Sequence, residues 1–144
     1  MMTKPSRKPT SKNLANEIAL VEDCPIMAAM SVIGGRWKLP LLWALRGGPK
    51  TVTELRKVLQ GSEKMLSQHA SELVRDGFLT RRAKQNVRGT VEYALSERGK
   101  QFIPVLQTIY DWSKEQSLHQ TVSSRLQRIE EQSRTARLCA PQKR

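Results

Sequence analysis

The spacing of apolar residues in the first half of the chain predicts short amphipathic helices separated by glycine- and proline-containing breaks. Four apolar stripes recur at helical spacing: Leu14, Ile18 and Val21; Ile26, Met30 and Ile33; Trp37, Leu41, Leu42 and Leu45; Leu55, Val58 and Leu59. Breaks are expected at Gly34-Gly35, Gly47-Gly48-Pro49 and Gln60-Gly61. Each of these helices should turn its apolar stripe toward a core.

Small hydroxyl residues mark where three helices are expected to begin. Thr53, Ser62 and Ser96 can each cap a helix, because a side-chain oxygen can accept a hydrogen bond from a free backbone N–H. The helix after Ser62 should run to Asp76, with Gly77 directly after its C-cap. Its inner stripe is expected to be Leu66, Ala70 and Leu73, and its opposite side carries Lys64, Gln68, Ser71 and Arg75.

The apolar period then changes from helical to alternating. Residues 79–84 predict a strand, residues 85–89 a turn, and residues 91–95 a half-buried strand. Helical spacing returns with Phe102, Leu106, Ile109 and Ser113, and Pro104 is expected to kink or divide this long helix. Further on, an amphipathic extension is indicated by Val122, Leu126 and Ile129, and the polar chain past Glu131 is expected to fray.

These elements divide the chain into three segments. Residues 1–13 are basic and polar and predict a disordered arm, residues 14–117 predict one folded domain, and residues 118–144 predict a basic extension that is partly helical or disordered. Two helices joined by a short glycine-containing turn precede a two-stranded basic hairpin. The fold class is therefore mainly α with a small β-hairpin wing (α+β), a winged helix-turn-helix.

The charge of the chain narrows the class of partner. The formal net charge is +12, and residues 34–95 hold 12 basic against 5 acidic side chains. Such an excess favours a polyanion. No apolar run approaches the roughly 20 residues that span a bilayer. We expect no enzyme, metal or cofactor, because no metal-ligand cluster, glycine-rich phosphate loop or nucleophile elbow occurs.

A winged helix-turn-helix with this charge predicts binding to double-stranded DNA. Cations neutralise phosphates and release counterions, and side chains of the second helix read base edges in the major groove. On that helix, bases are expected to be approached by Ser62, Lys64, Ser67, Gln68 and Ser71, of which Gln68 suits a bidentate contact to adenine. The groups expected to hold phosphate are Lys50, Arg56, Arg75, Arg81, Arg82, Lys84 and Arg88.

Two less specific interpretations compete with DNA binding. Basic helix faces are often only solvated surface, and a basic module without sequence-specific readout could instead serve RNA or acidic proteins. RNA readers usually offer stacked aromatic residues, and only seven aromatic side chains occur here, three of them in the last helix of the predicted domain. His69 has no second histidine at metal spacing, so it is interpreted as a capping or packing residue.

The order of several short motifs resembles the HxlR-type winged-helix transcriptional regulators, relatives of the MarR group. The motifs are Cys24-Pro25, Ile33-Gly34-Gly35-Arg36-Trp37, Lys64-Met65-Leu66-Ser67, Asp76-Gly77, Val91-Glu92-Tyr93-Ala94-Leu95-Ser96 and Gly99, and they cover about residues 20–115. The resemblance implies a bacterial, cytoplasmic homodimer that binds a near-palindromic operator, with a recognition helix at 62–76 and a wing at 79–95. We expect this homodimer to be nucleoid-associated and to act as a repressor. Ala70, Ser71 and the Asn86-Val87-Arg88-Gly89 tip depart from the family pattern, so no operator sequence is transferred.

The resemblance also implies dimerisation through the first and last helices. The apolar residues of the last helix exceed what a small core needs, which is typical of an interface. The simpler alternative is that they cover the core of one chain. The expected interface residues are Ile26, Met30, Phe102, Ile103, Leu106, Ile109, Tyr110 and Trp112.

Cys24 is a possible redox sensor, because several family members sense oxidants with a cysteine at the matching position. A thiol at a helix N-terminus sees a favourable dipole, which lowers its pKa, whereas the adjacent Glu22 and Asp23 disfavour the thiolate. The alternative is that Cys24 is only a small residue at a helix start. Cys139 could act as a resolving thiol only if the tail folds back, and the identity of any oxidant or small-molecule effector stays open.

Overall fold

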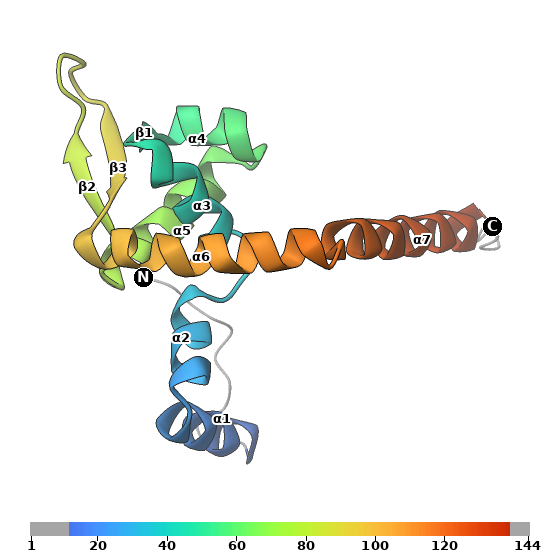
Figure 1. The fold of residues 1–144 in the computed structure, drawn as a ribbon. Helices are drawn as coiled ribbons and strands as arrows, with labels where there is room; N and C mark the ends of the chain where they lie inside the picture. Colours follow the sequence, from blue (N-terminus) through green and yellow to red (C-terminus); the bar gives the residue numbers. More distant parts are fainter. Residues whose placement is uncertain (1–11, 139–144) are drawn as a thin grey trace. The chain divides into compact units, whose positions relative to one another are not determined.

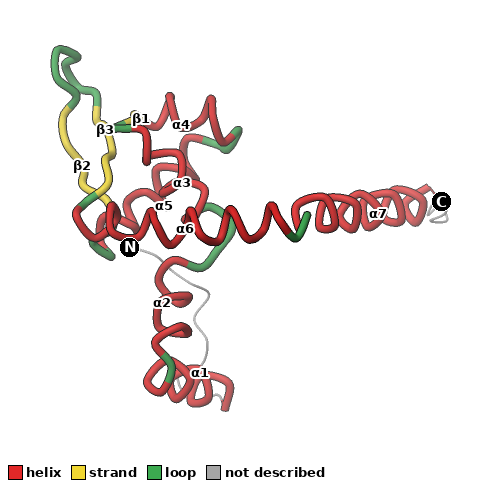
Figure 2. Tube along the Cα trace, viewed as in Figure 1, coloured by secondary structure: helices red, strands yellow, loops and turns green. Residues whose placement is uncertain are grey.

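The computed structural model describes residues 12–138, so the predicted disorder of residues 1–11 lies outside the described part of the chain. The chain forms two parts, Met1–Ile103 and Pro104–Arg144. The helices are α1 (Lys12–Asp23), α2 (Pro25–Ile33), α3 (Lys38–Ala44), α4 (Val52–Leu59), α5 (Glu63–Arg75), α6 (Glu97–Glu115) and α7 (Leu118–Leu138), with a 3-10 turn η1 (Leu45–Gly47) after α3 (Figure 1). The strands are β1 (Lys50–Thr51), β2 (Leu79–Ala83) and β3 (Val91–Leu95), and Figure 2 separates them from the helices by colour.

The centre of the first part is a three-helix cluster of α3, α4 and α5. Each of these helices contacts the other two. The largest fully buried side chains all belong to this cluster and to η1, which follows α3; they are Leu41, Leu42, Leu45, Leu55, Leu66 and Leu73. Burying a leucine side chain contributes about 1.5–3 kcal/mol. The apolar stripes predicted for α3 and α5 therefore form the core, while Val58 of α4, predicted on the apolar side, is 58% exposed.

The hairpin predicted after Gly77 is present, and a third strand joins it. The sheet has the order β1-β3-β2, with both neighbouring pairs antiparallel. Arg81 lies opposite Tyr93, which is buried, and Arg82 lies opposite Glu92. On the other side of β3, Lys50 of β1 also lies opposite Tyr93. The fold class is confirmed as a mainly helical winged helix-turn-helix, with a three-stranded sheet in place of the expected two strands.

The start of α4 differs from the prediction, because Thr51 is its N-cap in place of Thr53. The Thr51 hydroxyl accepts a hydrogen bond from the Glu54 N–H at 3.2 Å, and the Thr51 N–H donates to Glu54 Oε2 at 2.7 Å. This reciprocal pair is a capping box. Pairing of Lys50 and Thr51 with β3 fixes the extended backbone just before the helix, and a cap needs that conformation.

Three further predictions are corrected by the helices themselves. Ile26 and Met30 of α2 were expected to be buried, yet they are 72% and 46% exposed, and within α2 only Ile33 is buried. Pro104 lies inside α6, which continues to Glu115, so of the two predicted outcomes division is excluded and a kink stays a prediction. The chain past Glu131 does not fray where expected, since α7 continues to Leu138.

Candidate nucleic-acid interface

The α5 helix is built with one face sealed in the core and the other open to solvent. Leu66, Ala70 and Leu73 are all 0% exposed. The predicted outer side is exposed at each of its positions, Lys64, Gln68, Ser71 and Arg75. This placement follows from sequence, because residues spaced by three and four share a helix face. The helix therefore presents a row of polar side chains while its inner side is held rigidly.

A tight connection holds α4 and α5 together as a helix-turn-helix. Gln60 ends α4 in a left-handed conformation with a φ of 55°. Gly61 is buried, and a Cβ there would lie 2.8 Å from Met65 Cε and 3.2 Å from Leu66 Cδ2, so a larger residue would require these side chains to shift. Ser62 then caps α5 by accepting a hydrogen bond from the Met65 N–H at 3.3 Å. The Ser62 hydroxyl, predicted to approach bases, is thus already used to start the helix.

The hydroxyl groups on the outer face of α5 are partly committed to the helix backbone. Ser71 Oγ donates a hydrogen bond to the Ser67 carbonyl at 2.8 Å, which leaves the oxygen of Ser71 as an outward acceptor. Ser67 itself is half-buried. The Arg75 guanidinium is 60% exposed and lies 3.6 Å from Asp76. Among the described residues, no carboxylate lies within ion-pair distance of Lys64, so its charge is free to meet an anion.

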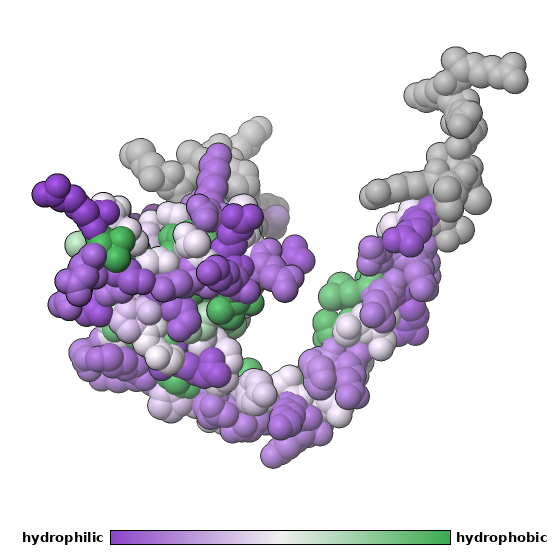
Figure 3. Space-filling model, turned by 90° about the horizontal axis from the view of Figure 1, so that it is seen from above, coloured by the Kyte–Doolittle hydropathy of each residue, from purple (hydrophilic) through white to green (hydrophobic). Residues whose placement is uncertain are grey.

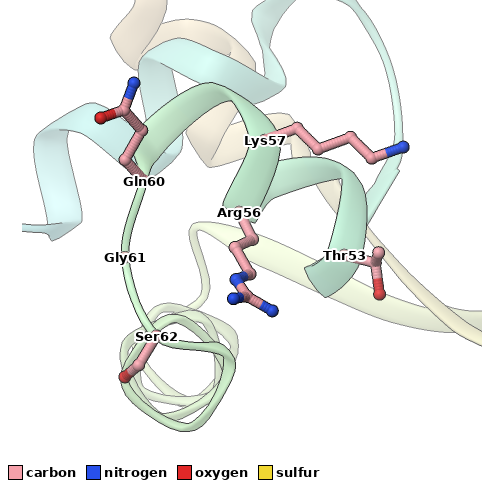
Figure 4. A pocket seen from close by; sticks show the side chains of 6 residues that line it. All are labelled: Thr53, Arg56, Lys57, Gln60, Gly61 and Ser62. Carbon is pink, nitrogen blue, oxygen red and sulfur yellow. The ribbon is translucent and has the colours of Figure 1, made fainter.

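A hollow of about 590 Å³ opens between the end of α4 and the start of α5. Its lining residues are Thr53, Arg56, Lys57, Gln60, Gly61 and Ser62, shown in Figure 4. The Arg56 guanidinium is exposed and lies 3.7 Å from the Glu63 carboxylate. Two cations beside the positive end of a helix favour an anion such as phosphate. Arg56 was predicted at the interface, whereas sequence reasoning missed Lys57, which follows it directly and faces the same hollow.

At the base of the hairpin, which comprises residues 79–84 and 90–95, two cations that were predicted to bind phosphate are paired with acids of the same chain. Arg82 Nε lies 2.7 Å from Glu92 Oε1, across the strand pair that sets them opposite each other. Lys84 Nζ donates to Glu54 Oε1 at 2.9 Å and so ties the hairpin to the start of α4. The backbone hydrogen bond from Thr51, followed by the bond from Lys84, holds the pKa of Glu54 at about 2, below its ordinary 4.5.

The tip of the hairpin differs from its base. The Lys84 N–H donates to the Thr90 carbonyl at 2.8 Å and closes the turn, which contains left-handed residues at Asn86 (φ 62°) and Gly89 (φ 76°). Arg88 is exposed at this tip, and among the described residues no acid lies within 4.0 Å of its guanidinium. Arg81, one strand position from Arg82, is likewise exposed. Lys50 is half-buried on β1.

A buried polar cluster holds the end of α5 and was missed by sequence reasoning. Lys38, whose side chain is 12% exposed, donates to the Val32 carbonyl at 2.7 Å and lies 3.4 Å from both Glu72 and Asp76. Glu72 is 7% exposed, and its Oε1 has no hydrogen-bond partner among the described residues. The available signal was the position of Glu72 on the inner side of α5, because a buried carboxylate requires a cation.

His69 lies beside this cluster, with Nδ1 at 3.6 Å from Glu72 Oε2. Its imidazole is 26% exposed, in agreement with its interpretation as a packing residue. The described residues contain no group of three or more histidine, cysteine or acidic side chains that could hold a metal ion. None of their helices has both the length and the apolar stretch needed to cross a membrane.

The predicted interface residues fall into two groups. Ile26, Met30, Ile109, Tyr110 and Trp112 are between 46% and 72% exposed, and their place in an interface stays a prediction. The other three are covered to different degrees. Leu106 is buried at 7%, Ile103 is half-buried, and Phe102 packs edge-on against Phe78 with ring centroids 5.9 Å apart. These three contribute to the interior of a single chain, which was the simpler alternative.

Cys24 is a free, half-buried thiol at the junction of α1 and α2. It occupies the N-cap position of α2 without a side-chain cap hydrogen bond. With Asn16, Ala19, Leu20 and Asp23 it lines a hollow of about 430 Å³. Cys139, the predicted resolving thiol, lies outside the described residues.

Comparison with known proteins places this arrangement in a family. A family model described as HxlR-like helix-turn-helix matches residues 32–122. The uncharacterized HTH-type transcriptional regulator YdeP of Bacillus subtilis is 37% identical over 94 residues, covering 65% of this chain and 73% of YdeP. A second relative, the uncharacterized HTH-type transcriptional regulator YtfH of Escherichia coli, is 36% identical over 103 residues, covering 71% of this chain and 82% of YtfH.

A solved structure, that of the redox regulator HypR in its reduced form, shows the same architecture. It is similar to this chain with a TM-score of 0.60 and 30% sequence identity, over 64% of this chain and 92% of HypR. The family match covers more than half of the chain, and the relatives are named as transcriptional regulators. The chain therefore belongs to the HxlR-like helix-turn-helix family of transcriptional regulators.

Proposed function

We propose that this regulator binds double-stranded DNA as a homodimer in the bacterial cytoplasm, with the outer face of α5 in the major groove of each half-site. The observation that supports this most is the division of α5 into an inner face that is fully buried and an outer face that is exposed and polar. An α-helix fits the major groove, and its outward side chains then meet the base edges. Gln68 is placed to contact a base, and Lys64 to contact a base or the adjoining phosphate.

The cations around α5 would grip the sugar-phosphate backbone on both sides. The hollow between α4 and α5 brings Arg56, Lys57 and the N-terminus of α5 to one phosphate. Arg88 at the hairpin tip would reach the flanking backbone or a narrow minor groove. Arg82 and Lys84 are already compensated by Glu92 and Glu54, so their main role is to position the hairpin.

Two copies are required to read a near-palindromic operator, because one winged module reads one half-site. The exposed apolar side chains of α2 and α6 supply a surface for the second copy. In this proposal Ile26, Met30, Ile109, Tyr110 and Trp112 meet the partner, and Leu106 stays in the interior of its own chain. An operator that overlaps a promoter would then give repression by occlusion.

A binding-site selection on purified full-length protein tests the proposal. Genomic fragments retained at physiological salt should share two half-sites about one helical turn apart. An excess of unrelated single-stranded RNA should displace these fragments less effectively than duplex DNA that carries the selected site. Retention without a shared sequence, together with displacement by RNA at equal strength, would favour the basic adaptor module over a sequence-specific regulator.

A thiol signal is a second proposal, and it rests on Cys24 as a free thiol in a fold that is similar to the redox regulator HypR. Oxidation of Cys24 beside the apolar surface of α2 would change a contact between the two copies. Operator affinity should then fall after peroxide treatment of the wild type and stay constant in Cys24→Ser. The Cys139→Ser variant is the control. A response of equal size in Cys24→Ser would assign the signal elsewhere.

A further inference from the structure

The α7 helix carries an apolar stripe that the described residues leave uncovered. Every side chain from His119 to Arg134 is exposed, including Val122 (46%), Leu126 (59%) and Ile129 (51%). Figure 3 shows hydrophobic surface gathered along one side of this helix among hydrophilic residues. The family match ends at residue 122, so most of α7 lies beyond the shared domain. Most of the stability of a helix in a protein comes from packing of its amphipathic face, and the uncovered stripe of α7 therefore indicates a partner.

The spacing of the stripe is that of a coiled-coil seam. Val122, Leu126 and Ile129 are separated by four and three residues, which places them at successive d, a and d positions of a heptad. The two neighbouring a positions are His119 and Ser133, so the apolar seam is short. Three apolar side chains per helix are too few to hold two molecules together alone. A seam this short can still add to a dimer that is formed by other surfaces, because its two halves then meet at high effective concentration.

The charges beside the seam select the orientation of the partner. In this register Arg125 occupies a g position, and Glu130, five residues later, occupies the following e position. In a parallel pair, a g residue of one helix faces the next e residue of the other, so Arg125 meets Glu130 of the partner subunit. An antiparallel pair would set g against g and e against e, and both contacts would join like charges.

We propose that α7 forms a short parallel coiled coil with α7 of a second copy over residues 122–130, a step that rests on the proposed homodimer. The seam is self-complementary under two-fold symmetry, as an identical partner requires. The paired helices would fix the two winged modules at a set distance from each other. The extension beyond the family domain therefore acts as a clamp that contributes to dimerisation, while DNA contact stays with α5 and the hairpin.

Cysteine cross-linking in full-length protein tests this pairing. In a background with Cys24→Ser and Cys139→Ser, Ile129→Cys at the seam should form a disulfide-linked dimer under mild oxidation. Ser124→Cys, at the outward f position, is the matched control and should cross-link at least tenfold more slowly. Equal rates for the two variants, or no linked dimer with Ile129→Cys, would overturn the proposal. Sedimentation of the same samples separates the two claims, because a dimer without the Ile129 cross-link leaves the proposed function intact, whereas a monomer contradicts both.

A charge exchange tests the orientation independently. Arg125→Glu and Glu130→Arg should each weaken the dimer about threefold, because each places like charges across a parallel seam. The double variant, with both charges exchanged, should recover wild-type dimer affinity. If Arg125→Glu and Glu130→Arg each leave dimer affinity unchanged, like charges face each other before and after the exchange, as in an antiparallel pair, and the proposal is wrong.

Discussion

Two arginines of the same hairpin, six residues apart, occupy opposite electrostatic situations. Arg82 at the base lies 2.7 Å from Glu92, and nearby Lys84 is bonded to Glu54 at 2.9 Å. Arg88 at the tip is exposed with no described acid in reach. The comparison teaches that the net charge of a segment overstates its contact with DNA. Cations that are exposed without an acid, or that face one only in a loose exposed pair as Arg56 does, are more available for phosphate than closely paired ones.

Two lysines around α5 differ in the same way, because one is paired with acids and the other is exposed. Lys38 contacts Glu72 and Asp76 from the buried side, whereas Lys64 stands on the exposed side. One lysine holds the recognition helix in place, and the other is placed to meet DNA. Four experiments with substituted proteins can break or sharpen these contrasts.

The largest effect is expected for Lys38→Met. Removing the ammonium leaves Glu72 buried without a cation, and breaking a buried pair in this way costs about 3 kcal/mol or more. Urea unfolding followed by circular dichroism should show this loss in the free energy of unfolding. Lys64→Met is the control and should stay within about 0.5 kcal/mol of wild type. A loss below about 1 kcal/mol for Lys38→Met would show that the cluster does not stabilise α5.

Gln68→Ala tests whether the outer face of α5 reads bases. A bidentate amide contact discriminates against a wrong base by about 1–3 kcal/mol, so the variant should lose its preference at one position of each half-site. A repeated binding-site selection measures this directly. An unchanged motif would remove Gln68 from the set of reading residues.

Arg88→Ala and Arg82→Ala form a matched pair within the hairpin. Loss of a charge-assisted phosphate contact at position 88 should weaken binding about tenfold on all sequences. The slope of log affinity against log salt should fall by about 0.9 per lost contact, which is about 1.8 for a dimer with Arg88→Ala in both copies, and by clearly less for Arg82→Ala. Fluorescence anisotropy at several salt concentrations gives both slopes. Equal reductions would contradict the distinction between tip and base.

The smallest effect is expected from Glu54 and depends on pH. Because the pKa of Glu54 is lowered to about 2 in the folded state, its contribution to stability is present above its ordinary 4.5 and is lost as pH falls toward 2. Glu54→Gln can keep the capping box but removes the charge that meets Lys84 and the helix N-terminus, so it should lower the free energy of unfolding at pH 6 by up to about 1 kcal/mol. The difference between variant and wild type should shrink toward pH 3. A constant difference across this range would show that the charge of Glu54 is unimportant.

Local rules predicted the parts of the fold that depend on neighbours in sequence. The Ser62 cap, the inner stripe of α5 and the left-handed Gly77 all follow from residue type and spacing. The Thr51 cap was missed although its signal is local, because Glu54 follows Thr51 by three residues, which is the spacing of a capping box. The Lys84–Glu54 pair spans 30 residues and has no signal in either local segment.

The candidate site was predicted to a similar extent. Its exposed face on α5 and its exposed hairpin tip follow from periodicity, since both are local properties of one helix and one turn. Which cations are compensated was not predictable, because compensation depends on how α4, α5 and the sheet meet. Exposure of Ile26 and Met30 escaped prediction for a related reason, since periodicity shows that residues share a face and does not show what covers it.

The most direct test of the central claim is methylation interference on a selected operator with the wild-type protein. Dimethyl sulfate modifies guanine N7 in the major groove and adenine N3 in the minor groove, so one experiment reports both grooves. If α5 lies in the major groove, guanine N7 methylation should block binding in two segments about one helical turn apart. Binding that is indifferent to N7 methylation throughout the operator would contradict the placement of α5.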